Sequence, residues 1–294
     1  MIYAVIVNPN AGKKKGLQTA EILMAALKKR KLQYELFVSH RPGQTIDHAI
    51  SLDTSRYEGI LAIGGDGTLF EVINGLLRGN GELSLPIGLI PVGTGNSFIK
   101  DLNITTREEA FQAVFSGRTK SVDVGEFTYG ENSWFFANLL GIGFVSNVAY
   151  RARKYKRLGA MSYIFGVLEE VAVLKASNIE MIIDGKKYKR EAVFVEVCNS
   201  RYTGGNMKMA PDALIDDGLL DVVLMNKSSR LELIRLFPSI FKGRHINDEK
   251  LEVFRGREVS IRSNCPLPLT PDGETFGETP IDIRIHPGKL TMYC

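Results

Sequence analysis

Residues 61–71 read LAIGGDGTLFE, and we expect this stretch to decide the fold of the chain. An apolar run from Gly59 to Ile63 leads into the glycine turn. A helix is expected from Thr68, because the following segment LFEVINGLL has helical spacing of apolar residues. Glycines let backbone N–H groups approach an anion closely, and the positive end of a helix dipole favours negative charge. The stretch therefore predicts a strand, a phosphate-binding turn and a helix, although Asp-Gly is also common in ordinary turns.

Asp66 narrows the kind of ligand that this turn is expected to bind. A carboxylate beside phosphate oxygens repels them unless a cation such as Mg²⁺ lies between the two. The turn thus favours a nucleotide bound together with Mg²⁺, with Asp66 as a metal-linked residue.

The composition is that of an ordinary globular protein with room for two domains. The chain has 294 residues, 44% hydrophobic and 24% charged, with a net charge of +4. This charge is mild and no aromatic-interleaved basic stripe is present, so we expect no nucleic-acid partner. Three distant cysteines fit neither a disulfide framework nor a zinc site. No signal peptide or membrane-spanning run is evident, so we expect a cytoplasmic protein.

The first part of the chain repeats the alternation of strand, glycine-rich turn and helix. A strand to Val7 is followed by NPNAGKKKG, and a third glycine turn, Gly93 to Ser97, follows the strand PIGLIP. Such alternation predicts a doubly wound, mostly parallel α/β sheet, which binds ligands at the carboxyl ends of its strands. Lys13 is the lysine of the first turn that we favour for contact with phosphate, whereas Lys14 and Lys15 fit a solvated charge run equally well.

From residue 120 onwards the pattern changes to alternating strands and hairpins. One strand is predicted over 134–140 and one helix over 152–176. We therefore expect an α/β domain over 1–123 and an antiparallel β-rich domain over 124–285.

Four motifs in this order, NPNAGKKKG, GGDGTLFEVING, PVGTGNS and PDGE, resemble the diacylglycerol kinase catalytic family. The resemblance covers essentially the whole chain. It implies a nucleotide-binding domain like those of phosphofructokinases and NAD kinases, a C-terminal β-sandwich, and ATP and Mg²⁺ as cofactors. It also implies that the last strand, at about 286–294, returns to the first domain. Gly95 and Ser97 depart from the GTxND pattern common in bacterial relatives, which puts the metal network near Asp66 and the identity of the substrate in doubt.

The resemblance also implies roles for individual residues. Asp272 would be the general base, and Asp66 would act with it in catalysis. The Asp217 side chain and the Leu214 and Leu219 carbonyls would hold a structural Mg²⁺. The remaining residues would contact the nucleotide: Asn8, Asn10, Gly12, Lys13, Ser39, Gly64, Gly65, Asp66, Gly67, Thr68, Glu71, Thr94 and Glu274. On the residues alone, Asp272 in LTPDGE fits a simple turn as well.

Two other functions share parts of this pattern. An NAD kinase uses the same GGDGT turn but usually carries an Asn-Glu pair soon after it, and this chain has Asn74 without such a pair. A catalytically silent regulator that binds nucleotide or lipid is the other alternative, and it would not need Asp66 or Asp272.

A lipid acceptor implies that the protein binds peripherally to an anionic membrane surface, at the inner face of the membrane. A homodimer is also possible. The segment RARKYKR, residues 151–157, precedes an apolar stretch and is the candidate for contact with anionic headgroups. A solvated basic helix start explains the same pattern equally well.

Overall fold

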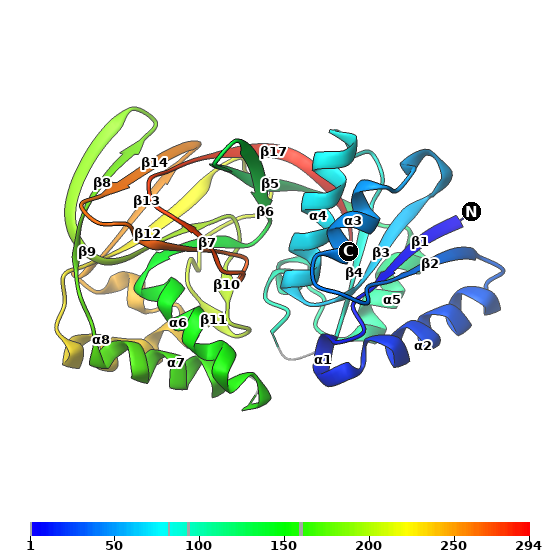
Figure 1. Ribbon diagram of the computed structural model, residues 1–294, viewed down its shortest axis with the longest axis horizontal. Coiled ribbons are helices and arrows are strands. Elements are labelled where there is room, and N and C mark those ends of the chain that lie inside the picture. The colour runs from blue at the N-terminus through cyan, green and yellow to red at the C-terminus, as the bar shows by residue number, and fades with distance from the viewer. Residues whose placement is uncertain (1, 82, 93–94, 159–160) are drawn as a thin grey trace. The chain divides into compact units, whose positions relative to one another are not determined.

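The computed structural model describes residues 2–81, 83–92, 95–158 and 161–294, which divide into two compact units (Figure 1). Unit 1 comprises Met1–Val122 with Gly288–Cys294, and unit 2 comprises Asp123–Pro287. Among the described helices, none is long and apolar enough to cross a bilayer.

Unit 1 is a parallel sheet with the strand order β4-β3-β1-β2. The end of the long strand β17 joins it, because Met292 pairs with Ile87 in parallel. The elements of this unit are β1 (Ile2–Val7), α1 (Ala11–Lys14), α2 (Gly16–Lys29), β2 (Gln33–Val38), α3 (Gln44–Ile50), η1 (Thr54–Arg56), β3 (Gly59–Gly64), α4 (Asp66–Asn80), β4 (Ile87–Pro91), η2 (Phe98–Leu102) and α5 (Arg107–Ser116).

The apolar runs of the sequence form the centre of this sheet. Every residue of β3 and of β4 is buried, as expected for strands covered on both faces. Helices α3 and α4 lie together on one face of the sheet (Figure 1). Their close packing depends on Gly75, where a Cβ would lie 2.4 Å from the Cβ of Ala49.

Unit 2 is built from antiparallel strands with helices against them. Its strands are β5 (Thr119–Tyr129), which starts in unit 1, β6 (Asn132–Phe136), β7 (Leu139–Gly143), β8 (Ser177–Ile183), β9 (Lys186–Cys198), β10 (Tyr202–Thr203), β11 (Met207–Lys208), β12 (Leu220–Asn226), β13 (Leu251–Gly256), β14 (Glu258–Ser263), β15 (Pro268–Pro271), β16 (Phe276–Glu278) and β17 (Ile281–Tyr293). Its helices are α6 (Phe144–Ala152), η3 (Arg153–Leu158), α7 (Met161–Ala172), α8 (Arg230–Leu236), η4 (Phe237–Lys242) and η5 (His245–Asn247).

Strand β9 organises the two cores of unit 2. Its first half pairs with β8, and its second half pairs with β7 and β12. Val195 and Val197 point into a core made by the strands alone. Val193 and Cys198 belong to a second core, which packs the strands against α6, α7 and α8. The predicted fold class, an α/β unit followed by an antiparallel β-rich unit, is confirmed.

Two predicted elements are wrong in their bounds. The single strand over 134–140 is two strands, β6 and β7, separated by Ala137 and Asn138. The single helix over 152–176 is a helix, α6, that begins at Phe144, then the 3-10 segment η3, and then α7. In both places a short break in regular structure carries a contact described below, and alternation of apolar residues does not reveal such breaks.

Candidate functional site

The predicted phosphate loops lie at the carboxyl ends of neighbouring parallel strands in unit 1. The loop after β1 and the turn after β3 touch, because Asn8 Nδ2 donates to Thr68 Oγ1 over 3.4 Å. Gly64 makes the second turn sterically allowed, since a Cβ there would lie 2.1 Å from Thr68 Oγ1. Helix α4 then starts at Asp66, so its first N–H groups and its positive dipole end lie at this edge. Gly65 and Gly67 are half-buried in the same turn.

The loop after β1 adopts an unusual backbone. Gly12, Lys13 and Lys14 all have φ between 55° and 70°, in the left-handed region. Such a conformation costs a non-glycine residue about 1 kcal/mol or more, and it is commonly kept at ligand-binding sites. Consecutive backbone N–H groups in mixed right- and left-handed turns form concavities suited to anions. The geometry fits the predicted role of Lys13 at a phosphate.

Asp66 links the second glycine turn to the third. Its carboxylate accepts hydrogen bonds from the backbone N–H groups of Ser97 (2.8 Å) and Phe98 (3.2 Å). Burial raises the pKa of the Asp66 carboxyl, and these hydrogen bonds lower it only in part. A carboxylate is the kind of ligand that Mg²⁺ prefers, so Asp66 fits the predicted metal, although both of its oxygens bond protein here. Within the described part of the chain, no three His, Cys, Asp or Glu side chains cluster as a metal site.

The other predicted nucleotide contacts of unit 1 lie on the same elements. Ser39 is buried at the end of β2, where its hydroxyl lies 2.7 Å from Thr45 Oγ1. The Asn10 N–H donates to Asn8 Oδ1 over 3.0 Å, which orders the first loop. Glu71 lies in α4, half-buried. The predicted contact Thr94 lies outside the described residues.

In unit 2, Asp272 is held by backbone from a distant part of the chain. Its carboxylate accepts N–H groups from Ala137 (3.0 Å to Oδ2), Asn138 (2.9 Å to Oδ1) and Leu139 (3.1 Å to Oδ1). These are the residues at the break between β6 and β7, where the N–H groups are not needed for a strand ladder. Asp272 itself is buried and has a φ of 47°. We call residues 137–139 the amide cradle.

The sequence did not predict the residues that bind the carbonyl groups of the amide cradle. The Asn199 side chain is fully buried, and its Nδ2 donates to the carbonyls of Asp123 (2.9 Å) and Ala137 (2.7 Å). The backbone N–H groups of Asn199 and Ser200 both donate to the Asn138 carbonyl. The only sequence signal was the polar pair Asn-Ser directly after the apolar strand β9.

Glu274 follows Asp272 in the same turn and meets Arg153 of η3. Arg153 Nη2 lies 3.0 Å from Glu274 Oε2 and donates weakly to the Gly273 carbonyl at 3.4 Å. Thr270 Oγ1 donates to the Glu274 carbonyl over 3.2 Å. The carboxylate of Glu274, which was predicted to contact the nucleotide, therefore pairs with Arg153 of the same unit.

The predicted structural metal loop has a different partner in this structure. Asp217 accepts the Leu219 N–H over 3.1 Å and also pairs with the Arg255 guanidinium. Leu214 is exposed. Beside them Asp221 Oδ2 is buried without a hydrogen-bond partner, so an oxygen ligand is present for a cation. The residues are compatible with Mg²⁺, and the ligand set itself stays a prediction.

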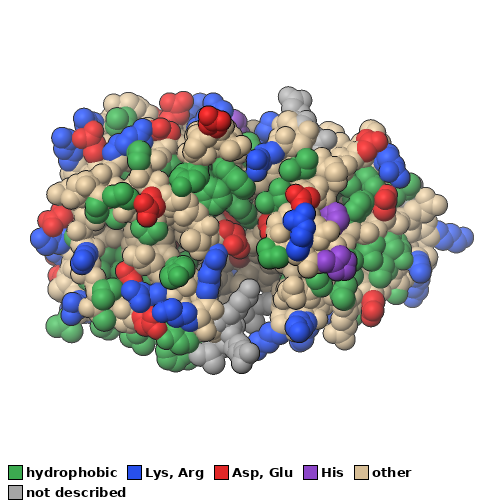
Figure 2. All heavy atoms as spheres, viewed as in Figure 1, with side chains coloured by type: hydrophobic (Ala, Val, Ile, Leu, Met, Phe, Trp, Pro, Cys, Tyr) green, Lys and Arg blue, Asp and Glu red, His purple; other side chains and the backbone are tan. Residues whose placement is uncertain are grey.

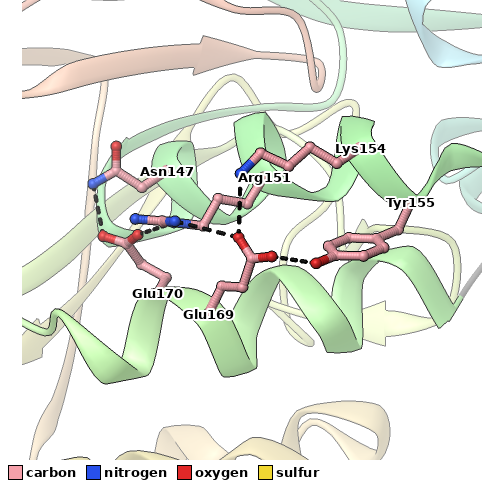
Figure 3. A network of polar contacts seen from close by, with 6 residues as sticks. All are labelled: Asn147, Arg151, Lys154, Tyr155, Glu169 and Glu170. Atoms are coloured by element: carbon pink, nitrogen blue, oxygen red, sulfur yellow. Dashed lines mark hydrogen bonds and ion pairs between the residues drawn. The ribbon is translucent and has the colours of Figure 1, made fainter.

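Figure 3 shows the segment that was predicted to contact anionic headgroups. Arg151 lies between two carboxylates of α7, at 2.5 Å from Glu170 Oε2 and 3.3 Å from Glu169 Oε2. Lys154 and Tyr155 also pair with Glu169. Together with Arg153, most of the described basic side chains of this segment are thus neutralised within unit 2, and this weakens the segment as a headgroup site. We call these residues the α6–α7 network: Asn147, Arg151, Lys154, Tyr155, Glu169 and Glu170.

Comparison with known proteins places this geometry in a family. Residues 3–127 match the diacylglycerol kinase catalytic domain, and residues 139–294 match the YegS C-terminal NAD kinase beta sandwich-like domain. The chain belongs to the diacylglycerol kinase family. The second match confirms the predicted β-sandwich type of unit 2, and the two matches together identify the enzyme as a kinase with an alcohol group as acceptor.

Individual relatives of this lipid kinase cover most of its length. It is 31% identical to the diacylglycerol kinase of Bacillus subtilis over 75% of this chain and 72% of that one. It is 29% identical to the diacylglycerol kinase of Staphylococcus saprophyticus over 94% of this chain and 90% of that one. A crystal structure of a Bacillus anthracis protein assigned as a diacylglycerol kinase is 25% identical, with a TM-score of 0.79 and coverage of 99% and 96%.

Proposed function

We propose that this kinase transfers the γ-phosphate of ATP to the hydroxyl of a diacylglycerol-like lipid. The observation that carries the proposal is Asp272, a buried carboxylate whose position and charge are fixed by the amide cradle. Phosphoryl transfer needs an attacking hydroxyl that is oriented and loses its proton. In this proposal Asp272 accepts that proton.

The chain's own residues supply the other requirements. Backbone N–H groups of the glycine turns and the α4 N-terminus hold phosphate oxygens, and Lys13 adds positive charge. Asp66 would hold Mg²⁺, which when bound neutralises charge on the phosphates. Ser97 contributes its backbone N–H to Asp66 in this chain, so the departure from the GTxND pattern leaves Asp66 oriented.

We also propose that the enzyme acts at the inner, cytoplasmic face of an anionic membrane. Its support is the lipid acceptor implied by the relatives. Positive and negative side chains are interspersed on the face shown in Figure 2, which gives no reason to propose a nucleic-acid partner.

The position of Asn74 argues against the alternative function, an NAD kinase. This residue is fully buried, and its Nδ2 donates to the Phe70 carbonyl over 2.8 Å within α4. It therefore holds its own helix and is not presented to a dinucleotide.

An ATP-consumption assay tests the proposed function directly. We expect Mg²⁺-dependent turnover with dioctanoylglycerol in mixed micelles and none with NAD. Sphingosine and phosphatidylglycerol are the other acceptors of the panel. Turnover with NAD alone would establish the NAD kinase alternative, and ATP binding without turnover on any acceptor would establish a silent regulator.

A further inference from the structure

Glu196 is a buried carboxyl that the proposed mechanism does not use. It lies in the second half of β9, is 4% exposed, and its Oε2 has no hydrogen-bond partner. A buried polar group without a partner usually costs stability, so its presence calls for an explanation. No described residue forms an ion pair with it.

The strand register places Glu196 two strands away from β15, the strand that leads to Asp272, with β7 between them. Glu196 pairs with Gly141 of β7, and Gly141 pairs on its other side with Thr270 of β15. All three face the second core of unit 2, under helix α6. Asp272 follows Thr270 by two residues on the same chain segment.

Gly141 brings the Glu196 carboxyl, Thr270 and Val145 close to one point on β7. A Cβ at Gly141 would lie 3.5 Å from Glu196 Oε1 and 3.7 Å from Thr270 Cγ2. The same point lies 2.9 Å from Cγ2 of Val145, in the first turn of α6. Val145 is half-buried, so the side chain nearest to this point is partly exposed to solvent. The Glu196 carboxyl therefore lies near a partly exposed side chain of α6, across β7 from Thr270.

We propose that Glu196 is a specificity-determining residue that donates a hydrogen bond to an ester carbonyl of the acceptor lipid, next to the hydroxyl held at Asp272. This inference rests on the proposed function. In a diacylglycerol the ester carbonyls lie a few bonds from the free hydroxyl, so one acceptor can reach both sites once Val145 rotates away.

The protonation of Glu196 suits a carbonyl better than an ammonium group. Burial raises the pKa of Glu196 to about 8, so the carboxyl is neutral at pH 7 and carries a proton to donate. The titratable neighbours on the same face are Cys198 and Asp221, both acids, and the buried side chains of α6 are apolar apart from Ser146. Arg255 of β13, the cation beside these acids, pairs with Asp221 Oδ1 over 3.2 Å, and no described cation pairs with Glu196.

The test compares two acceptors that differ only in the carbonyls, dioctanoylglycerol and its dioctyl ether analogue. The variants are Glu196→Gln, which keeps a donor, and Glu196→Met, which is apolar and of similar length. We expect the wild type to prefer the ester in KM and in binding by titration. Glu196→Met should raise KM and Kd for the ester about tenfold while leaving the ether values and kcat nearly unchanged, and Glu196→Gln should keep most of the preference.

The outcomes separate this inference from the proposed function. A wild type without preference, a parallel change on both acceptors in Glu196→Met, or no binding of either lipid would overturn the role of Glu196. Ester-selective binding without phosphorylation would instead uphold Glu196 and refute the kinase reaction. Thermal unfolding checks both variants, and Glu196→Ala replaces Glu196→Met if the latter does not fold. Loss of activity on sphingosine alone in both variants would show an ammonium partner and would contradict the carbonyl assignment.

Discussion

At the scale of single residues, both candidate catalytic carboxylates are held in position by backbone N–H groups. Asp66 accepts from Ser97 and Phe98, and Asp272 accepts from the amide cradle. Backbone donors belong to the fold and do not depend on side-chain rotamers, so they orient a carboxylate with little entropic cost at the moment of reaction. Glu196 is the opposite case, a carboxyl with an oxygen left unpaired.

We predict that Asp272→Asn lowers kcat by about 10²- to 10⁴-fold, because the proton acceptor is lost. One side-chain atom becomes an NH₂ group that faces an N–H donor of the cradle, so a stability loss of about 1–3 kcal/mol is expected as well. Steady-state kinetics and urea unfolding measure the two effects, with nucleotide binding as the control. Near-normal turnover would remove Asp272 from the mechanism.

We predict that Glu196→Gln stabilises the protein increasingly as pH rises. The folded-state pKa of about 8 is above the unfolded value of about 4.5, so the stability linked to this proton is complete below pH 4.5 and is lost as pH rises to about 8. The unfolding midpoint of the variant should exceed that of the wild type by several degrees at pH 9 and by little at pH 5. A difference that is constant with pH would show that Glu196 does not titrate in this window.

At the scale of elements, short breaks in regular structure position the groups that contact Asp272 and Glu274. The break between β6 and β7 creates the amide cradle, and η3 between α6 and α7 carries Arg153 to Glu274. The α6–α7 network holds α6 and η3 against α7, because α6 and η3 supply its hydrogen-bond donors and α7 supplies its carboxylates (Figure 3). Arg151, Arg153 and Lys154 of the basic segment therefore also link elements within unit 2.

We predict that Glu170→Gln destabilises unit 2 by about 1–3 kcal/mol, because the half-buried Arg151 loses the nearer of its two carboxylate partners and keeps only Glu169. Activity should fall to a similar degree on dioctanoylglycerol in anionic vesicles and in neutral micelles. Glu180→Gln is the matched control, since its pairs with Lys187 and Lys189 are exposed and contribute at most about 1 kcal/mol. A loss confined to anionic vesicles would restore the segment as a membrane contact.

We predict that Mg²⁺ raises the unfolding midpoint of the wild type and that EDTA lowers it, because a cation in the loop around Asp217 binds only the folded state. Asp217→Ala should remove this dependence while changing kcat little. A wild-type midpoint that responds to neither Mg²⁺ nor chelator would show that the loop relies on the Arg255 pair alone.

At the scale of the whole molecule, the chain enters unit 2 after Val122 and returns to unit 1 at Gly288. Strand β17 serves both units, since Ile281 to Arg284 pair with β14 and Met292 pairs with β4. Leu290 and Met292 are fully buried. The last residues of the chain therefore complete the core of unit 1.

We predict that a chain ending at Pro287 loses nucleotide binding, because unit 1 then lacks buried side chains worth about 2–5 kcal/mol each. Unit 2 should keep a cooperative unfolding transition of its own. The control is a chain lacking only Cys294, whose side chain is half-buried. Unchanged ATP affinity after the longer truncation would show that unit 1 does not need the returning strand.

The sequence alone determined the strand–turn–helix order of unit 1, the glycine turns and the kinase family. These features are local, because the spacing of apolar residues and the glycines that a turn requires are written within about ten neighbouring positions. It also singled out Asp66 and Asp272, but their partners were not predictable. Asp272 is bound by backbone N–H groups 133 to 135 positions away, and the Asn199 side chain binds the Ala137 carbonyl across 62 positions. Only the tertiary structure decided these contacts, and with them the partners of the basic segment and the burial of Glu196. Pairing between distant segments depends on strand register and packing, for which a single sequence carries no local signal.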